Sequence, residues 1–328
     1  MSSKKTVKQH NPYQKYLEEK HNKLNAPNEI IEKVVKRATN STMVNKKRII
    51  EGEVNEVYEV ITKDNQRVIV RISRSKHPRF EAEEKAIRLA LMAGVPAPKV
   101  LLIEKVSLEN ENLTFCVEKK TEGQPLKNLM QNIDQETLKS IIAEAGQILS
   151  QIHSVKLDGF GGLDRDELYR SWEEFVLRPK QKLERITEAV KTMRIDINLV
   201  NEAIKILKDH TDLYKDTSPQ LLHGDFSIKH FLIKNNHIVG IIDFENAKGG
   251  DPVFDFAWLN YFYGQVVPID WLKEGYKNKD LFDSNFETKM KLYRLHLGLG
   301  FIDYYEYEKN EAGMNHTRQK FLEELKNF

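Results

Sequence analysis

The strongest constraint on the fold is a pair of apolar runs separated by a short polar turn. Residues 231–233 (Phe-Leu-Ile) and 238–242 (Ile-Val-Gly-Ile-Ile) flank the pair Asn235-Asn236. An asparagine pair suits the two-residue turn of a β-hairpin, in which both central residues need a positive φ. The sequence therefore predicts an antiparallel hairpin that pairs Lys234 with His237.

The register of this hairpin brings polar residues together. His230 falls opposite Ile241 and Asp243 falls opposite Ile228, so Asp243 lies beside the loop that carries Asp225. Two carboxylates held close together repel each other unless a cation lies between them. Either aspartate alone is more simply explained as a turn cap or a strand end. The pair favours chemistry in which one carboxylate holds a divalent metal and the other accepts a proton from a hydroxyl nucleophile.

A second hairpin is predicted nearer the N-terminus. Residues 57–61 and 67–72 are rich in β-branched side chains and surround the polar turn 63–65. Alternation in the second strand separates its apolar side chains from Arg71, which lies on the opposite face with Ile69. The residues that share the apolar face are Val68, Val70 and Ile72.

A helix is predicted over residues 80–93, closed by Gly94. Glu83 falls on the apolar side of this helix, where a carboxylate without a partner is costly. Arg71 is the charged residue of the preceding strand. We therefore expect an Arg71–Glu83 ion pair.

The pattern along the chain predicts a β-rich half followed by a helical half. Strands are expected at 100–103 and 113–117, and an apolar stripe of helical period follows Asp134, a residue suited to cap a helix. Further helices are expected at about 13–24, 28–39, 166–193, 198–213, 253–263 and 286–308. The fold class is α+β, in two lobes: residues 1–117, a linker at 118–123, and a mainly helical lobe at 124–328. Clefts between lobes are common ligand sites.

Charge and cysteine content narrow the function classes. The 51 basic and 49 acidic side chains leave a net charge of +2, which offers no face for nucleic acid or an anionic membrane. Cys116 is the only cysteine, and no stretch reads as a signal peptide or a membrane span. We expect a cytoplasmic protein, monomeric or weakly dimeric, whose partner is a small molecule.

The polar loops match a known family. His223-Gly224-Asp225, a polar residue at 230, and Ile242-Asp243-Phe244-Glu245 resemble the catalytic and metal-binding loops of protein-kinase-like folds. This version of the pattern resembles the aminoglycoside phosphotransferase family, which includes macrolide- and choline-kinase-like enzymes. Asp251-Pro252 and Asp255 continue the match, which runs from about Glu51 to Glu308. The resemblance implies a two-lobed, protein-kinase-like fold.

The resemblance also implies roles for individual residues. Asp225 would be the catalytic base and Asp243 would hold Mg²⁺ against the phosphates of ATP or GTP. Arg71 would contact the α- and β-phosphates, with Glu83 as its helical partner, and Asp255 would brace the catalytic loop. The purine would meet the backbone of the linker residues Glu118, Lys119, Lys120 and Thr121.

Three positions depart from the usual pattern. The phosphate-covering loop at 51–58 has a single glycine, so Asn55 is expected to take part in nucleotide binding. Arg71 stands where lysine is usual, and arginine can bind phosphate through two parallel hydrogen bonds. His230 replaces the usual asparagine as a metal ligand, although Mg²⁺ prefers oxygen. His230 therefore leaves open the number of metal ions and the choice between ATP and GTP.

Several functions compete on these residues. The main hypothesis is an ATP- or GTP-dependent kinase that phosphorylates a hydroxyl group of an antibiotic, an aminoglycoside or a macrolide; the alternative acceptor is a metabolite such as choline, homoserine or a sugar. A metal-dependent hydrolase would instead use His223, Asp225, His230 and Asp243 to hold zinc. A nucleotide-binding scaffold without catalysis is a third class.

Three groups of residues near these motifs have a simpler structural reading. The acidic run at 303–311 could hold a cationic aminoglycoside, although a solvated helix face is the simpler expectation. Trp258, with Tyr261 and Phe262, fits a core. His153 and His223 fit structural roles inside the fold.

Overall fold

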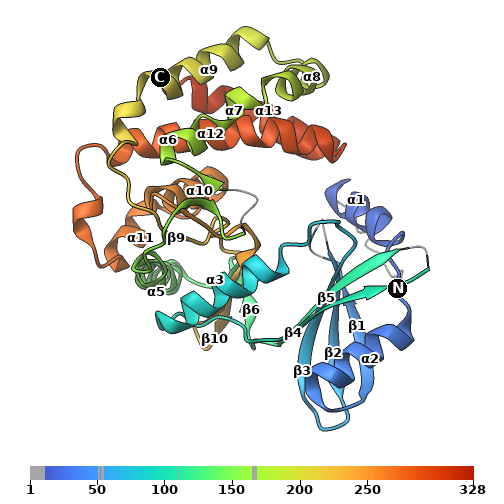
Figure 1. The fold of residues 1–328 in the computed structure, drawn as a ribbon. Helices are drawn as coiled ribbons and strands as arrows, with labels where there is room; N and C mark the ends of the chain where they lie inside the picture. The colour runs from blue at the N-terminus through green and yellow to red at the C-terminus, as the bar shows by residue number, and fades with distance from the viewer. Residues whose placement is uncertain (1–11, 51, 53–54, 110, 165–167) are drawn as a thin grey trace, which may run out of the picture.

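The computed structural model describes residues 12–50, 52, 55–109, 111–164 and 168–328. The chain forms a β-rich half and a larger helical half, and residues 120–123 connect strand β5 of the first to strand β6 of the second (Figure 1). Three residues of the predicted phosphate-covering loop, Glu51, Glu53 and Val54, lie outside the described residues.

The first half is built on a five-stranded antiparallel sheet of order β1-β2-β3-β5-β4. Its strands are β1 (Met43–Ile49), β2 (Glu56–Thr62), β3 (Arg67–Ser73), β4 (Val100–Ser107) and β5 (Asn112–Lys119). The predicted β2–β3 hairpin is confirmed: Val60 pairs with Val68 and Glu56 with Ile72, and Asn65 takes the positive φ that the turn requires. The predicted apolar face of β3 is buried.

Three helices accompany this sheet: α1 (Pro12–His21), α2 (Asn28–Thr39) and α3 (Phe80–Met92). One side of α2 is exposed, but Ile31, Val34 and Val35 are buried in the same apolar cluster as Val68 and Val70. Burying such a side chain contributes about 1.5–3 kcal/mol, so α2 is an integral layer of this half.

Helix α5 (Gln135–His153) runs through the second half and confirms its predicted start. The Asp134 carboxylate accepts a 2.8 Å hydrogen bond from the backbone N–H of Thr137, as an N-cap does. The predicted apolar stripe is buried along the whole helix: Leu138, Ile141, Ile142, Ala145, Ile148, Leu149 and Ile152. His153 is also buried and hydrogen-bonded, as expected of a core histidine.

The second half also contains long helices and short helices. The long ones are α8 (Leu183–Met193), α9 (Ile197–Asp209), α10 (Val253–Tyr263), α12 (Phe286–Tyr307) and α13 (Glu311–Leu325). The short ones are α4 (Leu126–Leu129), α6 (Trp172–Val176), α7 (Arg178–Gln181), α11 (Ile269–Gly275) and the 3-10 turns η2 (Thr211–Leu213), η3 (Phe244–Asn246) and η4 (Lys279–Leu281). None of the described helices is long and apolar enough to cross a membrane.

The helix predicted over 166–193 is wrong as a single element. Strands β7 (Phe160–Gly162) and β8 (Leu168–Tyr169) precede three separate helices, α6, α7 and α8. Ser171 caps α6, and Pro179 stands in the first turn of α7. Proline has no N–H to donate and clashes with the preceding turn, so a helix starts there more readily than it continues through.

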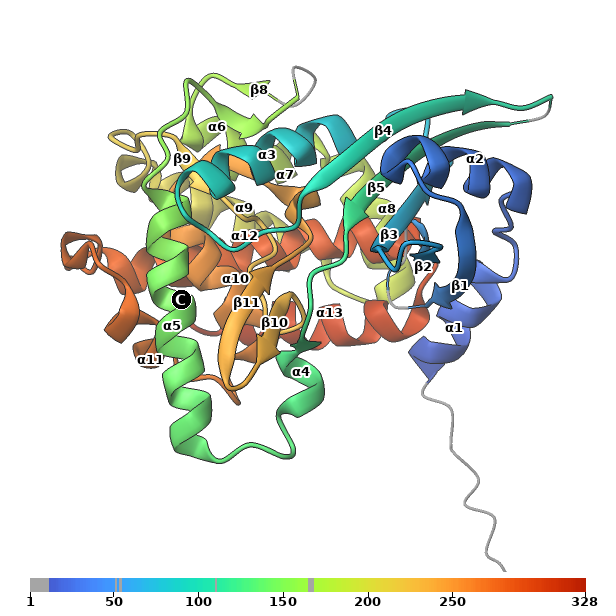
Figure 2. The same ribbon diagram turned by 90° about the horizontal axis from the view of Figure 1, so that it is seen from below.

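Two small sheets present the polar loops. One has the order β11-β10-β6 and the other β8-β7-β12-β9. Their remaining strands are β6 (Gln124–Pro125), β9 (Gln220–Leu222), β10 (Phe231–Lys234), β11 (His237–Ile241) and β12 (Lys248–Gly250). The loop 223–230 joins β9 to β10, and the loop 242–247 joins β11 to β12. Figure 2 shows the β10–β11 hairpin beside α5 and α4.

The β10–β11 hairpin confirms the turn and corrects the register. Asn235 and Asn236 have φ of 54° and 63°, and Lys234 pairs with His237. The register then shifts by one residue, so that Leu232 pairs with Gly240. This irregularity adds one residue to β11, as a β-bulge does. His230 consequently lies opposite Ile242, not opposite Ile241 as predicted. The backbone oxygen of His230 accepts a 3.1 Å hydrogen bond from the N–H of Ile242.

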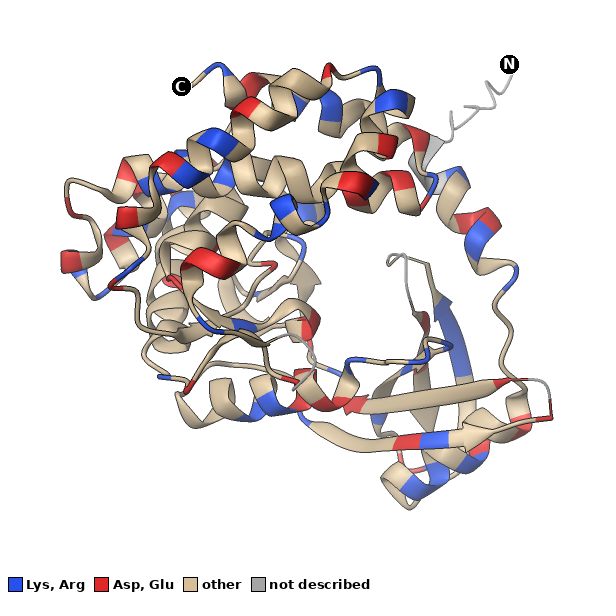
Figure 3. Cartoon of the chain, turned by 45° about the horizontal axis from the view of Figure 1, so that its top comes forward, with Lys and Arg blue, Asp and Glu red and all other residues tan. Residues whose placement is uncertain are grey.

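Acidic and basic residues are interspersed along both halves of the chain (Figure 3). Many of them form ion pairs within the chain. In the segment predicted to be an acidic run, Asp303 contacts Arg185 at 2.9 Å and Lys182 at 3.5 Å. Glu306 pairs with Lys309 and Glu308 with Lys20. This run is therefore not the solvated face expected from sequence, since its carboxylates are largely neutralised by neighbours.

Candidate active site

The loop 223–230 is held by a buried carboxylate on α10. Asp255 accepts hydrogen bonds from the backbone N–H groups of His223 (2.8 Å) and Gly224 (2.9 Å) and from His153 Nε2 (3.1 Å). Although burial opposes it, these hydrogen bonds and the nearby imidazoles hold the pKa of Asp255 below its usual range. The bracing contact that the resemblance implied for Asp255 is present.

Gly224 allows the loop to turn at this point. Its φ is +78°, and a Cβ at this position would lie 2.0 Å from the backbone oxygen of Asn246. Only glycine fits such a close approach in this conformation. The two polar loops can therefore lie in direct contact.

His223 links the two loops from inside. Its Nδ1 accepts the N–H of Asp225 at 3.2 Å, so Nε2 carries the proton and donates to the Ile242 oxygen at 3.1 Å. Burial, with His230 nearby, lowers the pKa of His223 to about 4. A neutral imidazole with both nitrogens used has none left for a metal ion. His223 supports the loop, and the four-ligand zinc site of the hydrolase hypothesis is wrong.

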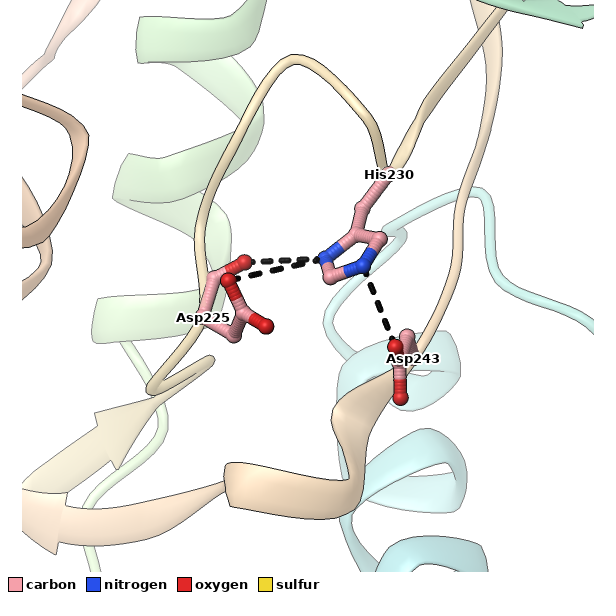
Figure 4. A group of neighbouring side chains, drawn as sticks. All are labelled: Asp225, His230 and Asp243. Carbon is pink, nitrogen blue, oxygen red and sulfur yellow. Dashed lines mark hydrogen bonds and ion pairs between the residues drawn. The ribbon is translucent and has the colours of Figure 1, made fainter. Parts of the chain in front are cut away.

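Asp225, His230 and Asp243 converge in one cluster (Figure 4). Each offers one ligand atom, and the three atoms lie within 4.8 Å of one another. Asp243 adopts a left-handed backbone, with φ of 68°. Such a conformation is uncommon for a residue other than glycine and is concentrated at functional sites.

His230 bridges the two aspartates. Its Nδ1 lies 2.9 Å from the backbone oxygen of Asp225, and its Nε2 lies 3.1 Å from Asp243 Oδ2. Both partners can only accept, so both ring nitrogens must donate and the imidazole is protonated in this arrangement. Against the effect of burial, Asp225 and Asp243 raise the pKa of His230. His230 also holds the pKa of Asp243 below its usual range, although burial opposes this.

The Asp225 carboxylate has two further partners that sequence reasoning did not identify. Trp258 Nε1 donates to Oδ1 at 2.8 Å, and Lys229 Nζ lies 3.1 Å from Oδ2. Although desolvation of the ammonium opposes it, Asp225 raises the pKa of Lys229, so this side chain is charged. The helical spacing of Trp258 indicated only a core position. A lysine four residues after the aspartate, within the same short loop, was the available signal for Lys229.

The predicted Arg71–Glu83 pair is confirmed. Arg71 Nη1 on β3 lies 2.6 Å from Glu83 Oε1 on α3, and both side chains are buried. The second terminal nitrogen of the guanidinium, Nη2, lies 3.1 Å from Glu245 Oε2 and 3.9 Å from Asp243 Oδ1. Asn55 Nδ2 also donates to Glu245, at 3.2 Å. Glu245 was not predicted as a site residue, although it stands two residues after Asp243.

Carboxylates outnumber cations around Arg71. Burial raises the pKa of Glu83 to about 8, with Asp243 and Glu118 adding to the shift against the lowering effect of Arg71. Burial and Asp243 raise the pKa of Glu118 and of Glu245 in the same direction. Four carboxylates around one guanidinium favour the arrival of a further cation. The carboxylate oxygens of Asp225 and Asp243 suit Mg²⁺ as donors, and His230 becomes a ligand only after it loses a proton.

The predicted purine-binding segment is partly used by the sheet. Glu118 is buried at the end of β5, next to the Arg71 cluster. The N–H groups of Lys119 and Lys120 already donate to the backbone oxygens of Lys99 and Arg67. Lys120 Nζ pairs with Glu59 at 2.7 Å, and Thr121 packs against Gly240. A purine would therefore have to use other backbone groups of this segment.

Comparison with known proteins agrees with this geometry. The model of the phosphotransferase enzyme family matches residues 47–279. Among curated proteins, hygromycin-B 4-O-kinase of Escherichia coli is 24% identical over 189 residues, which are 56% of this chain and 52% of that protein. The chain thus spans about half the length of the curated relative it matches.

Solved structures share the fold. A thermostable mutant of an aminoglycoside phosphotransferase, in ternary complex with ADP and hygromycin B, aligns with a TM-score of 0.71 and 18% identity over 90% of this chain and 98% of that one. A second aminoglycoside phosphotransferase, bound to ADP, aligns with a TM-score of 0.61 and 18% identity over 92% and 99%. These similarities confirm the two-lobed, protein-kinase-like α+β fold. Because the family model covers well over half of the sequence, the chain belongs to the phosphotransferase enzyme family.

Proposed function

We propose that the protein is an ATP- or GTP-dependent O-phosphotransferase that acts on a hydroxyl group of a small molecule. One observation carries the proposal. Asp225 and Asp243 come from separate loops and meet around His230, with ligand atoms within 4.8 Å of one another and Arg71 3.9 Å from Asp243. This combination supplies a base, a carboxylate for a metal ion and a cation for phosphate, which phosphoryl transfer requires.

Asp225 would accept the proton of the acceptor hydroxyl. Trp258 holds Oδ1, so the carboxylate is fixed in orientation and would present Oδ2 to the acceptor. Such positioning of a base contributes through proximity and through proton transfer in the transition state. His223 and Asp255 would keep the loop in place without contacting substrate.

The nucleotide side would use the other loop and the sheet. Arg71 would contact the phosphates, oriented by Glu83 and Glu245, and Asn55 would support the covering loop. Asp243 would hold Mg²⁺, which when bound neutralises charge on the transferring phosphates. His230 would act as a second ligand only as a neutral imidazole, a condition that favours one metal ion over two.

The acceptor is proposed to be an antibiotic of the aminoglycoside or macrolide type. The similarity to hygromycin-B 4-O-kinase supports an antibiotic. Two features favour an acceptor with an apolar face over a highly cationic one. The partly buried rings of Trp258, Phe262 and Phe301 pack together, with centroids 5.2–5.6 Å apart, and Trp258 contacts Asp225. The acidic run of α12, moreover, is paired within the chain.

A coupled assay of nucleoside-diphosphate release tests the proposal. The protein is incubated with MgATP or MgGTP and panels of aminoglycosides, macrolides and hydroxylated metabolites. Saturable turnover with one acceptor, and a phosphorylated product by mass spectrometry, is expected. Asp225→Ala should abolish transfer and still bind nucleotide, whereas Asp158→Ala, on the surface, should leave both unchanged. Full transfer by Asp225→Ala would overturn the mechanism, and saturation by choline, homoserine or a sugar alone would assign the alternative acceptor class.

A further inference from the structure

Lys229 differs from every neighbour in its loop. Within residues 221–230, all of which the structure describes, it alone is exposed. About half of its side chain is accessible, at 46%, compared with 10% for Asp225. A lysine that served only to support the loop would be expected to lie against it. Lys229 instead combines a half-exposed side chain with an ammonium 3.1 Å from the carboxylate in the centre of the site.

The contact of Lys229 with Asp225 involves the reactive side of that carboxylate. Trp258 Nε1 occupies Oδ1 at 2.8 Å, with Ser227 Oγ a more distant partner at 3.4 Å. Lys229 Nζ occupies Oδ2 at 3.1 Å. An acceptor hydroxyl that approaches Oδ2 must therefore share that oxygen with the ammonium. The hydroxyl oxygen, and the phosphorus it attacks, would then lie close to the charge of Lys229.

We propose that Lys229 is a further catalytic residue, whose ammonium moves from Asp225 to the transferring phosphoryl group. The inference rests on the proposed function. In the reaction, a bond forms between the acceptor oxygen and the γ-phosphorus. The bond from that phosphorus to the β–γ bridging oxygen breaks, and its electron pair leaves with the nucleoside diphosphate. The hydroxyl proton passes to Asp225 Oδ2, and Lys229 keeps all of its protons.

Charge explains why the ammonium would move. Once Asp225 takes the proton it is neutral, and Lys229 loses its ion-pair partner. The negative charge now lies on the phosphoryl group and its new ester. A flexible, strongly hydrated point charge such as lysine can follow it by rotation of its side chain. Lys229 would thus hold the base in its ionised form before transfer and stabilise the phosphoryl group during transfer.

Three variants at position 229 test the inference. Lys229→Ala, Lys229→Gln and Lys229→Arg are compared with wild type by steady-state kinetics, with MgATP and MgGTP, against the best acceptor of the panel above and against water. Removal of a donor to a developing charge lowers kcat by about 10² to 10³, so we expect a loss of at least about 100-fold in kcat for Lys229→Ala. The KM of the acceptor and the affinity for nucleotide should change little, and Lys229→Arg should retain more activity than Lys229→Gln. Methylamine added to Lys229→Ala should restore part of kcat.

Lys205→Ala is the matched control. Lys205 and Asp209 also form a pair four residues apart, at 2.9 Å, but on the exposed face of α9. This variant should keep the kcat of the wild type. The inference is overturned if Lys229→Ala keeps the wild-type kcat, if it raises only the KM of the acceptor, or if its loss does not respond to methylamine. Absence of transfer by the wild type to every acceptor would instead overturn the proposed function.

Discussion

Trp258 Nε1 donates a 2.8 Å hydrogen bond to Oδ1 of Asp225. The indole belongs to α10, and its ring packs against Phe262 and Phe301. A packed ring has little rotational freedom, so this hydrogen bond fixes the carboxylate relative to a helix and not only to its own loop. Asp255, on the same helix, holds the loop backbone one turn away. Helix α10 therefore positions both the loop and its reactive side chain.

Trp258→Phe should lower kcat without unfolding the protein. The phenyl ring keeps most of the packing and removes the donor. A hydrogen bond to a charged group is worth about 1.5–3 kcal/mol, so kcat should fall by about 10- to 100-fold if the bond is needed in the transition state. Steady-state kinetics and thermal denaturation measure the two effects. Tyr261→Phe, which changes one polar atom in the same helix, is the control; equal kcat for Trp258→Phe and wild type would argue against a positioning role.

The sequence predicts those parts of the site that depend on local pattern. The Asn235-Asn236 turn, the Arg71–Glu83 pair and the cap at Asp134 follow from turn chemistry, alternation and capping, which operate over a few residues. The register of the β10–β11 hairpin was wrong by one residue because a bulge near Val239 depends on packing that the apolar pattern does not specify.

Apart from Lys229, which meets Asp225 across only four positions, the contacts that were missed join distant parts of the chain. Trp258 meets Asp225 across 33 positions, and Glu245 meets Arg71 across 174. Helical period assigns Trp258 to a buried face but cannot say which polar atom lies within reach of its N–H. The protonated state of His230 likewise follows from two acceptors brought together by tertiary structure. The family resemblance identified the loops, and only the fold could identify what surrounds them.

Above about pH 8, the pKa to which burial raises Glu83, the Arg71–Glu83 pair should behave as a buried ion pair. Loss of one partner leaves the other charge buried, which costs about 3–5 kcal/mol, whereas replacement of both by apolar residues is often far less harmful. We therefore expect Arg71→Met to destabilise the fold strongly and Arg71→Met/Glu83→Met to recover part of the loss. Urea unfolding of Arg71→Met, of Glu83→Met and of the double variant, measured above pH 8, gives the coupling energy between the two residues. Additive losses would show that Glu245 and Asp243 satisfy Arg71 without Glu83.

His230→Asn should strengthen magnesium binding. The substitution removes the positive charge between Asp225 and Asp243 and provides an amide oxygen, which Mg²⁺ prefers to nitrogen. Two unit charges 4 Å apart interact by about 4 kcal/mol at an effective dielectric constant of 20. We therefore expect the magnesium affinity of His230→Asn to exceed that of wild type by about tenfold, or ~1.4 kcal/mol. Magnesium titration of nucleotide turnover measures the apparent magnesium affinity, with exposed His237→Asn as control. Weaker magnesium binding by His230→Asn than by wild type would mean that the imidazole is itself the better ligand.

Gly224→Ala should disrupt the contact between the two polar loops. The added Cβ would lie 2.0 Å from the Asn246 oxygen in a backbone of positive φ, so the loop must move. A loss of about 2–4 kcal/mol in unfolding free energy, with loss of transfer, is expected from strain of this kind. Gly300→Ala in α12 is the matched control, because its Cβ meets nothing within 4 Å and alanine favours a helix. Equal stability of the two variants would show that the loop relaxes freely.

His296 should make the fold less stable in mild acid. It is fully buried in α12, and its Nδ1 donates to the Val176 oxygen at 2.8 Å. Burial lowers the pKa of His296 well below its usual value, and Arg178, Lys248 and Lys182 add to the effect. In the unfolded chain the pKa of this residue is about 6.5. Below that pH the unfolded chain binds a proton at His296 that the folded chain does not bind. Stability from this group is therefore complete above about pH 6.5 and falls, by up to ~1.4 kcal/mol for each unit, as the pH drops below it.

His296→Asn isolates this contribution. The asparagine amide can still donate to the Val176 oxygen, as Nδ1 does, but it does not titrate. Urea unfolding at a series of pH values from about 5 to 8 should show a smaller dependence on pH for His296→Asn than for wild type. His237→Asn, at a side chain that is 74% exposed, should follow the wild-type curve. If His296→Asn and wild type lose stability in parallel below pH 6.5, other buried groups, and not His296, set the acid sensitivity of the helical half.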